Sequence, residues 1–384
     1  MTTATPQGFR IHAGRCGIRE DRDDFVVIAS DVPASTSAMF TRSRFAGPSV
    51  TISRTAAPQG TARAVVALSG NANVATGDPG HRDALEIRDA VARVIGSAPD
   101  EVFVASTGLI GQRYPMAAIR AHLDELRAPF AGTDFGPAAA AIMTTDTHPK
   151  LRSVSVGGAT ITGVAKGVGM MEPNMATLLT FFCTDARIAT AELDPIFRRV
   201  IDRTFNALSI DTDTSTSDTA IVLANGLAGP VDRIEFEQAL GALALDLVKD
   251  IARDGEGATT LIEVRVTGAR DDEQARRVGK VVVNSPLVKT AVHGADPNWG
   301  RVAMAIGKCE DDVDIVPEHV AIRFGDIAVY PEVPGDAELD EVRVHLRGDA
   351  VLIGIELGIG RGAFSVYGCD LTEGYVRLNA DYST

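Results

Sequence analysis

A glycine-bearing loop contains a hydroxyl group that could act as a nucleophile. It reads Lys166-Gly-Val-Gly-Met-Met-Glu-Pro-Asn-Met-Ala-Thr177 and runs into the apolar sequence Leu-Leu-Thr-Phe-Phe. A threonine hydroxyl is a weak nucleophile without a neighbouring base, and the free amine of an N-terminal threonine is one such base. That amine exists only after the peptide bond before Thr177 is cut, which the Thr177 hydroxyl could begin by attacking the carbonyl of Ala176. In the structural alternative, the loop enters a buried strand and Thr177 is merely hydrogen-bonded.

A second segment could supply the hydrogen-bond donors that acyl chemistry requires. Ser106, Thr107 and Gly108 follow the strand-like run Val102-Phe-Val-Ala, so we expect them in a loop that leaves a strand. Successive backbone amides and a hydroxyl in such a loop can stabilise the negative oxygen of a tetrahedral intermediate. On spacing alone, an ordinary turn is the competing interpretation.

These motifs resemble the ornithine acetyltransferase family, also called the bifunctional glutamate N-acetyltransferases, in which a Lys-Gly-x-Gly-Met…Pro-Asn-Met-Ala-Thr segment is the self-cleavage site. The likeness extends from Ser69-Gly-Asn-Ala-Asn to Asn379-Ala-Asp-Tyr-Ser-Thr384, which is essentially the whole chain. It implies cleavage between Ala176 and Thr177 and ping-pong transfer of acetyl from N2-acetylornithine to glutamate through an ester on Thr177, in cyclic arginine biosynthesis. The new amine has a reference pKa of about 7.7–8.0, which suits proton transfer near neutral pH.

The resemblance also implies which residues form the site. Thr107 and Gly108 would form the oxyanion hole. The substrate contacts would come from Thr147, Lys166, Thr177, Glu256, Asn379 and Thr384. A lysine suits a carboxylate, and an acid between two glycines suits the α- or δ-ammonium of an amino acid, although both could be ordinary surface charges. The chain departs from the family pattern at Val168, where a serine is usual, and at Val74-Ala75, where a cysteine is usual, and we expect cleavage to survive the first change.

Two further patterns are better explained by structure than by chemistry. Residues 211–218 alternate Asp with hydroxyl residues but lack the Gly and Glu positions of an EF-hand, so they predict a polar turn and not a calcium site. His293 and Trp299 indicate a packed corner in which His293 is hydrogen-bonded and is not a general base. The four cysteines are scattered, which argues against a disulfide framework or a cysteine-based zinc site. We expect neither a metal nor a cofactor.

Composition bounds the class of protein. With 384 residues and 45% hydrophobic content, the chain can bury a sizeable core. The net charge of −14 and the absence of a basic run make nucleic acid an unfavourable partner. No apolar stretch reaches 18 residues, and the N-terminal residues lack the pattern of a signal peptide. We therefore expect a cytoplasmic protein with no membrane partner.

The elements around the motifs do not alternate strictly, which predicts the α+β class. Apolar runs indicate strands within 9–67 and at 102–105, 153–156, 160–165, 220–224, 261–266, 320–324, 351–357 and 363–368. Helical periodicity is found at 83–95, 115–126, 191–206 and 235–253. Gly157-Gly158 predicts a hairpin. The chain is expected to end directly after a strand and to be tied down there.

The resemblance refines this picture. It implies a four-layer α-β-β-α sandwich of the DmpA-like type, self-cleaved into an alpha chain of residues 1–176 and a beta chain of residues 177–384. The two cleaved chains would stay associated as an α2β2 heterotetramer.

Two related functions remain open at this point. An aminopeptidase or amidohydrolase with an N-terminal nucleophile would use the same groups, with water in place of the amine acceptor. An acyltransferase of specialised metabolism would differ only in its substrates. A binding protein that has kept the fold without activity is disfavoured, because it would not need the chemical set of Thr107, Gly108, Lys166, Thr177 and Glu256.

Overall fold

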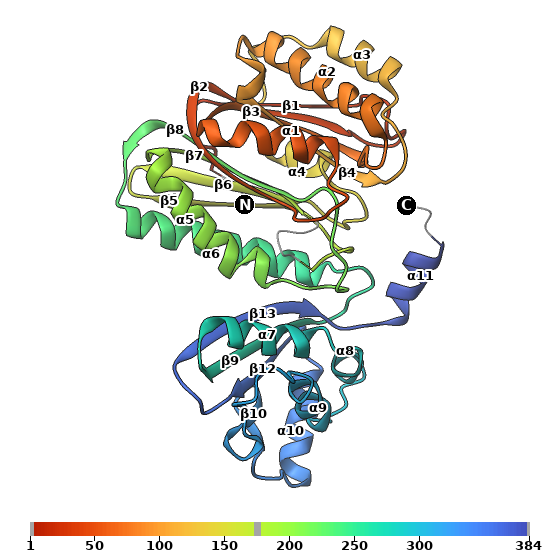
Figure 1. Ribbon diagram of the computed structural model, residues 1–384, viewed down its shortest axis with the longest axis vertical. Helices are drawn as coiled ribbons and strands as arrows, with labels where there is room; N and C mark the ends of the chain where they lie inside the picture. Colours follow the sequence, from red (N-terminus) through yellow and green to blue (C-terminus); the bar gives the residue numbers. More distant parts are fainter. Residues whose placement is uncertain (1–3, 173–177, 382–384) are drawn as a thin grey trace.

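The computed structural model of the protein describes residues 4–172 and 178–381. Two β-sheets, an upper and a lower one in Figure 1, are surrounded by helices. The predicted α+β class is confirmed. Ala176, Thr177 and Thr384, which the motifs predict at the site, lie outside the described residues.

The larger sheet has the order β4-β3-β2-β8-β7-β6-β5, with β1 paired to β2. Its strands are β1 (Phe9–Gly14), β2 (Phe25–Phe40), β3 (Thr61–Asn71), β4 (Val102–Leu109), β5 (Lys150–Val156), β6 (Ala159–Lys166), β7 (Leu179–Arg187) and β8 (Thr219–Pro230). The long strand β2 joins two halves, since its first part pairs with β1 and β3 and its last part pairs with β8. The register with β3 shifts between Ala29 and Ala34, where β2 passes from one half to the other.

Apolar side chains pack between these two halves. Phe9 of β1 and Phe103 of β4 share one buried cluster with Phe181 of β7 and Ile221 of β8. Helix α4 (Gly136–Ala141) contributes alanines to the same cluster. Because β1, β3 and β4 belong to one half and β6, β7 and β8 to the other, this cluster is a core between two layers of strands.

Helices cover the outer faces of both halves (Figure 1). On one side are α1 (Pro48–Ala56), α2 (Gly77–Ile95) and α3 (Met116–Glu125), and on the other are α5 (Thr190–Arg203) and α6 (Arg233–Arg253). Ile87 of α2 packs in a cluster with Val66 and Val104, whereas Phe197 of α5 packs in a cluster with Phe182 of β7. These helices have an apolar stripe at helical spacing, which explains why sequence periodicity found all but α1.

The smaller sheet has the order β11-β10-β12-β9-β13 and forms the lower part of Figure 1. Its strands are β9 (Leu261–Ala269), β10 (Ala321–Phe324), β11 (Ile327–Tyr330), β12 (Ala350–Glu356) and β13 (Gly362–Cys369). The helices around it are α7 (Asp272–Val283), α8 (Pro286–His293), α9 (Gly300–Ile306) and α10 (Asp336–Leu346). The sequence predicted most of these strands but not a separate sheet.

The structure corrects two local predictions and bears out two others. Thr107 and Gly108 are the last part of strand β4 and not a loop, because they continue the pairing with β3. The chain does not end after a strand, since the helix α11 (Glu373–Asp381) follows β13. The hairpin at Gly157-Gly158 is confirmed between β5 and β6, and so is the hydrogen-bonded state of His293, whose Nδ1 lies 3.0 Å from Asp370 Oδ2.

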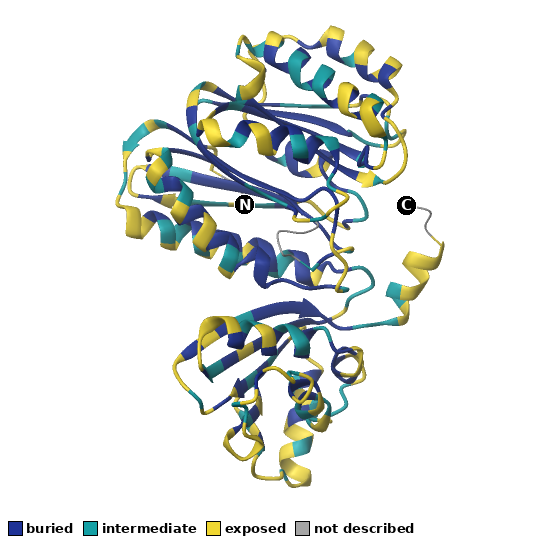
Figure 2. Ribbon diagram, viewed as in Figure 1, coloured by how far each residue is buried: buried dark blue, intermediate teal, exposed yellow. Residues whose placement is uncertain are grey.

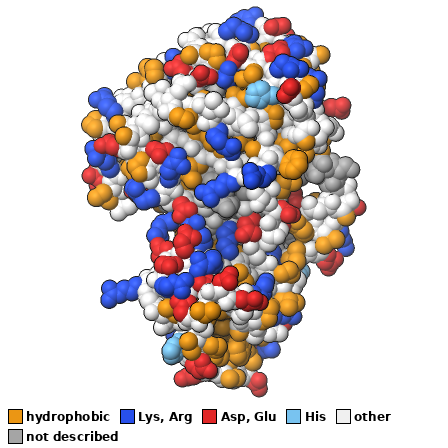
Figure 3. Space-filling view, in the orientation of Figure 1, with side chains coloured by type: hydrophobic (Ala, Val, Ile, Leu, Met, Phe, Trp, Pro, Cys, Tyr) orange, Lys and Arg blue, Asp and Glu red, His pale blue; other side chains and the backbone are white. Residues whose placement is uncertain are grey.

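Burial and charge follow the layers. Figure 2 shows the strands of the larger sheet as mostly buried, while α11 has no buried residue. Acidic and basic side chains lie intermixed over the face drawn in Figure 3. Within residues 4–172 and 178–381, no helix combines the length and apolar character that crossing a membrane requires.

Candidate active site

One cavity of about 530 Å³ brings together five of the residues predicted from the motifs. Thr107 and Gly108 come from β4, Lys166 from the end of β6, Glu256 from the loop after α6, and Asn379 from α11. These elements are far apart in sequence, so the fold itself assembles the group.

The wall formed by β4 requires glycine. The strands β3 and β4 run parallel, and Gly70 lies opposite Gly108. Gly108 has a φ of +125°, and a Cβ on it would come within 2.2 Å of the carbonyl carbon of Gly70. Only glycine fits such a close approach of two backbones. With Thr107 buried beside it, this stretch can present backbone N–H groups and a hydroxyl to the cavity, which is the chemistry of an oxyanion hole.

Lys166 is a buried cation in the cavity wall, with 4% of the residue exposed. Its Nζ donates a hydrogen bond to Thr144 Oγ1 at 3.1 Å. Burial lowers the pKa of the Lys166 ammonium, while the nearby carboxylate of Asp146 acts in the opposite direction. A solvated surface charge does not have these surroundings, whereas a group that receives a substrate carboxylate does.

A buried ionic network holds the turn that follows Lys166. Asp146 Oδ1 accepts hydrogen bonds from Lys150 Nζ at 2.8 Å and from the amide of Gly167 at 2.9 Å. Lys150 Nζ also donates to Asp254 Oδ2 at 2.6 Å. Burial alone would raise the pKa of Asp146, but Lys166 and Lys150 together hold it below its usual value. Asp146 is therefore an ionised anchor, and the motif analysis missed its role although it lies inside a motif.

Glu256 is held at the cavity by groups from three segments. Its carboxylate accepts hydrogen bonds from Thr145 Oγ1 at 2.9 Å and from Asn379 Nδ2 at 2.9 Å. Its amide donates to the carbonyl of Val168 at 2.8 Å, which ties it to the segment that follows β6. Gly169 leaves the space for this carboxylate, since a Cβ there would lie 2.5 Å from Glu256 Oε2. The acid and its amide partner Asn379 thus form one unit.

Thr147 is not brought to this cavity. It is exposed, its amide donates to Asp254 Oδ2 at 3.0 Å, and its hydroxyl donates to the other oxygen of the same carboxylate. The earlier threonines of the same string, Thr144 and Thr145, line the cavity instead. Spacing alone could not distinguish them, because the three hydroxyl residues lie within four positions.

Asp218 is a buried acid that the sequence did not single out. It precedes β8 and is fully buried. Burial raises its pKa to about 8, against the opposing effect of the Leu178 backbone. The amide of the next residue, Thr219, donates to the carbonyl of Leu178 at 2.9 Å. A proton-holding acid therefore lies near the start of β7, and Leu178 directly follows Thr177 in the chain.

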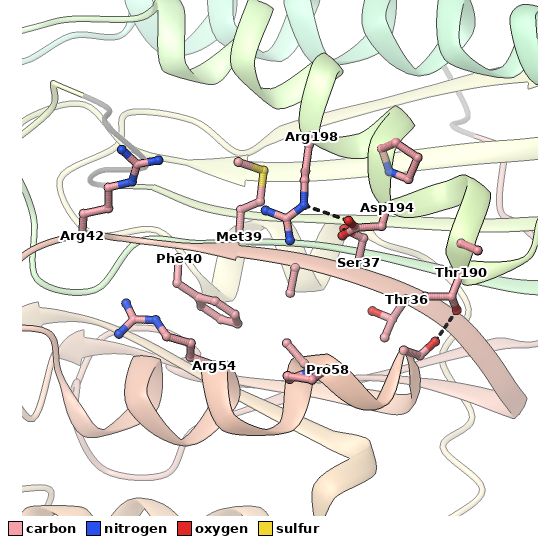
Figure 4. A pocket seen from close by; sticks show the side chains of 15 residues that line it. Thr36, Ser37, Met39, Phe40, Arg42, Arg54, Pro58, Thr190, Asp194 and Arg198 are labelled. Carbon is pink, nitrogen blue, oxygen red and sulfur yellow. Dashed lines mark hydrogen bonds and ion pairs between the residues drawn. The ribbon is translucent and has the colours of Figure 1, made fainter.

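A larger cavity lies elsewhere and does not contain the predicted groups. It has a volume of about 650 Å³ and lies between β2 and α5 (Figure 4). There the carboxylate of Asp194 accepts hydrogen bonds from Ser37 Oγ at 2.7 Å and from Arg198 Nε at 2.8 Å. Size alone is a poor guide here, so we place the candidate site in the smaller cavity, where the motif residues meet.

Comparison with known proteins identifies the family. The model of the ArgJ family matches residues 10–384. The chain belongs to the ArgJ family. The family assignment confirms the resemblance seen in the motifs.

Among curated members of the ArgJ family, the chain is 65% identical over 389 residues to "Glutamate N-acetyltransferase Oat2" of Streptomyces clavuligerus, with 100% of this chain and 99% of that protein covered. It is 54% identical over 389 residues to "Arginine biosynthesis bifunctional protein ArgJ" of Rhodococcoides fascians, with 100% and 96% covered. A crystal structure of arginine biosynthesis bifunctional protein argJ from Bacillus halodurans shares 43% identity, covering 52% of this chain and 96% of that chain with a TM-score of 0.49.

Proposed function

We propose that this protein is a glutamate N-acetyltransferase of arginine biosynthesis that moves the acetyl group of N2-acetyl-L-ornithine to L-glutamate. The cavity that sets Lys166 and Glu256 beside Thr107 and Gly108 carries the proposal. Family membership and full-length relatives with the names "Glutamate N-acetyltransferase" and "Arginine biosynthesis bifunctional protein" support it.

The charges of the cavity fit the donor substrate. N2-acetylornithine has an α-carboxylate and a δ-ammonium on either side of its acetamide. The buried ammonium of Lys166 suits the carboxylate, and the carboxylate of Glu256 suits the ammonium. Asn379 and Thr145 hold Glu256 in place, so its charge is already oriented before the substrate binds.

The chemistry would proceed through Thr177. Cleavage between Ala176 and Thr177 divides the protein into an alpha chain of residues 1–176 and a beta chain of residues 177–384. The Thr177 hydroxyl attacks the acetyl carbonyl, its α-amine accepts the proton, and the oxyanion receives hydrogen bonds at Thr107 and Gly108. The C–N bond then breaks, the proton passes to the leaving amine of ornithine, and acetyl remains as an ester on Thr177. The amine of glutamate attacks that ester and restores the hydroxyl.

The remaining parts of the proposal concern the assembly. The order of helices, half-sheet, half-sheet and helices in the larger sheet supports a four-layer sandwich of the α-β-β-α, DmpA-like type. The two cleaved chains stay together because strands of both pair in one sheet, as β6 does with β7. Two such pairs form an α2β2 heterotetramer. Thr384 would complete the proposed substrate contacts, whereas Thr147, which lies outside the cavity and is bonded to Asp254, is left out of them.

The test is product analysis with purified protein, N2-acetylornithine and glutamate. We expect ornithine and N-acetylglutamate in equal amounts. Free acetate with little N-acetylglutamate would favour an amidohydrolase or aminopeptidase, and transfer only to other amines would favour an acyltransferase of specialised metabolism.

A further inference from the structure

We propose that Arg19 binds the side-chain carboxylate of the acceptor glutamate, so that one cavity accepts both an ammonium-ended and a carboxylate-ended substrate. Neither the motifs nor the family likeness assigned a role to this residue. The inference rests on the proposed function, because it concerns the second substrate of that reaction.

The two substrates pose opposite demands on the same cavity. In a ping-pong reaction the acceptor enters after the donor has left, and it must reach the same acyl group. Ornithine ends in an ammonium, for which Glu256 is suited, whereas glutamate ends in a second carboxylate. With Lys166 occupied by the α-carboxylate, a second cation is needed to bind that end without leaving a charge unpaired.

Arg19 lies where such a cation is needed. It lines the same cavity as Lys166 and Glu256. Its stem lies against Gly70, since a Cβ on Gly70 would be 2.9 Å from Arg19 Cγ and 3.3 Å from its Cδ. Gly70 in turn is the strand partner of Gly108. The arginine therefore runs alongside the strand pair that carries the proposed oxyanion donors.

The backbone that carries Arg19 is fixed by a buried carboxylate. Asp24 is fully buried, and it accepts hydrogen bonds from the amides of Cys16 at 2.6 Å, Ile18 at 2.8 Å and Arg19 at 2.7 Å. Three charge-assisted bonds to one carboxylate hold this turn in a single conformation. Less entropy is then lost when the side chain binds a ligand.

The guanidinium of Arg19 retains donors for a ligand. Its side chain is 18% exposed, and its buried Nε makes no hydrogen bond within the described residues. It forms a long ion pair, 3.5 Å from Asp21 Oδ1, with an acid that is 62% exposed and is also paired with Arg22. Arginine has a planar fork of N–H groups of the geometry that binds a carboxylate in pairs, which suits a residue that lines this cavity to a carboxylate ligand.

The experiment separates the two half-reactions in Arg19→Gln, Arg19→Lys and the control Arg22→Gln. We expect Arg19→Gln to raise the KM for glutamate about 10- to 100-fold, the loss expected for a hydrogen-bonded charge pair. Release of ornithine from N2-acetylornithine should stay close to wild type. The preference of Arg19→Gln for glutamate over glutamine should fall by a similar factor, and Arg19→Lys should keep part of that preference. Arg22→Gln changes a residue of the same loop that does not line the cavity, so it should behave as wild type.

A glutamate KM within about twofold of wild type in Arg19→Gln, or an equal loss in both half-reactions, would overturn the proposal. Calorimetric titration of the same variants with glutamate and with ornithine measures binding without the reaction, so it tests the role of Arg19 independently of the proposed function. If wild type binds glutamate but never acetylates it, the transferase assignment fails, while selective loss of glutamate binding in Arg19→Gln still supports Arg19. Equal weakening for glutamate and ornithine would count against Arg19 whatever the reaction.

Discussion

Adding one methyl group at Gly169 should displace the carboxylate of Glu256 without unfolding the protein. A Cβ there would lie 2.5 Å from Glu256 Oε2, and an ordinary contact begins at 3.4 Å, so the carboxylate must move by about 0.9 Å. The neighbour is the far end of a flexible side chain, which can give way at little cost to packing. Gly169 has no positive φ of the kind that disfavours alanine, so the contact with Glu256 is the main effect.

The size of the effect follows from the hydrogen bonds that the shift breaks. Glu256 accepts from Thr145 and Asn379 at 2.9 Å each, and a shift of this size takes at least one of them beyond the roughly 3.2 Å limit of a good hydrogen bond. A hydrogen bond to a charged group contributes about 1.5–3 kcal/mol. The misplaced carboxylate should therefore bind the substrate ammonium more weakly by a similar amount, which corresponds to an increase in the KM for N2-acetylornithine of about 10- to 100-fold.

The assay measures kcat, the KM for N2-acetylornithine and the thermal unfolding midpoint of Gly169→Ala. Gly158→Ala is the matched control, because a Cβ on Gly158 meets no atom within 4 Å. We expect the control to match wild type, and we expect Gly169→Ala to lose substrate affinity with an unchanged midpoint. An unchanged KM in Gly169→Ala would refute the role given to Glu256, and a large fall in the midpoint would refute the claim that the side chain gives way.

Three further predictions address the other groups of the site. Thr107→Ala should slow transfer roughly 100- to 1,000-fold with little change in folding, and steady-state rates within a few-fold of wild type would remove Thr107 from the oxyanion hole. Because burial raises the pKa of Asp218 to about 8, well above its unfolded value of about 3.9, its presence should make the free energy of unfolding fall as pH rises from about 4 to 8. Denaturant titrations should show that Asp218→Asn loses this part of the pH dependence, and an identical pH profile would contradict the buried, protonated state. Thr177→Ala should abolish both cleavage and transfer, whereas Thr177→Ser should keep both at altered rates, as gel analysis and product assays can check.

The sequence predicted those parts of the fold that depend on local pattern. Helix α6 and the hairpin between β5 and β6 have strong local signals, which are an apolar stripe and a pair of glycines. The pairing of β9 with β12 joins Leu261 to Ala350 and depends on contacts between distant residues, so no local pattern marks the second sheet. Helix α11 has no buried residue and therefore has no apolar periodicity to reveal it.

The residues of the site also differ in whether a local sequence pattern could predict them. Lys166 and Glu256 could be found because each stands next to glycines inside a recognisable motif, and both line the cavity. Asp218 and Arg19 could not be found in this way. In the sequence, an acid or an arginine in a polar loop resembles a solvated charge, and only the fold shows that it is buried. The choice between Thr145 and Thr147 likewise depends on Asp254, which is more than 100 residues away and binds the second of them.

The most direct test of transfer through Thr177 is intact-mass analysis of the purified protein before and after mixing with N2-acetylornithine. We expect two polypeptides, the second beginning at Thr177. This second chain should gain one acetyl group, which fragmentation assigns to Thr177 and which glutamate removes. An active protein that remains one full-length chain, or an acetyl group on any other residue, would contradict transfer through Thr177.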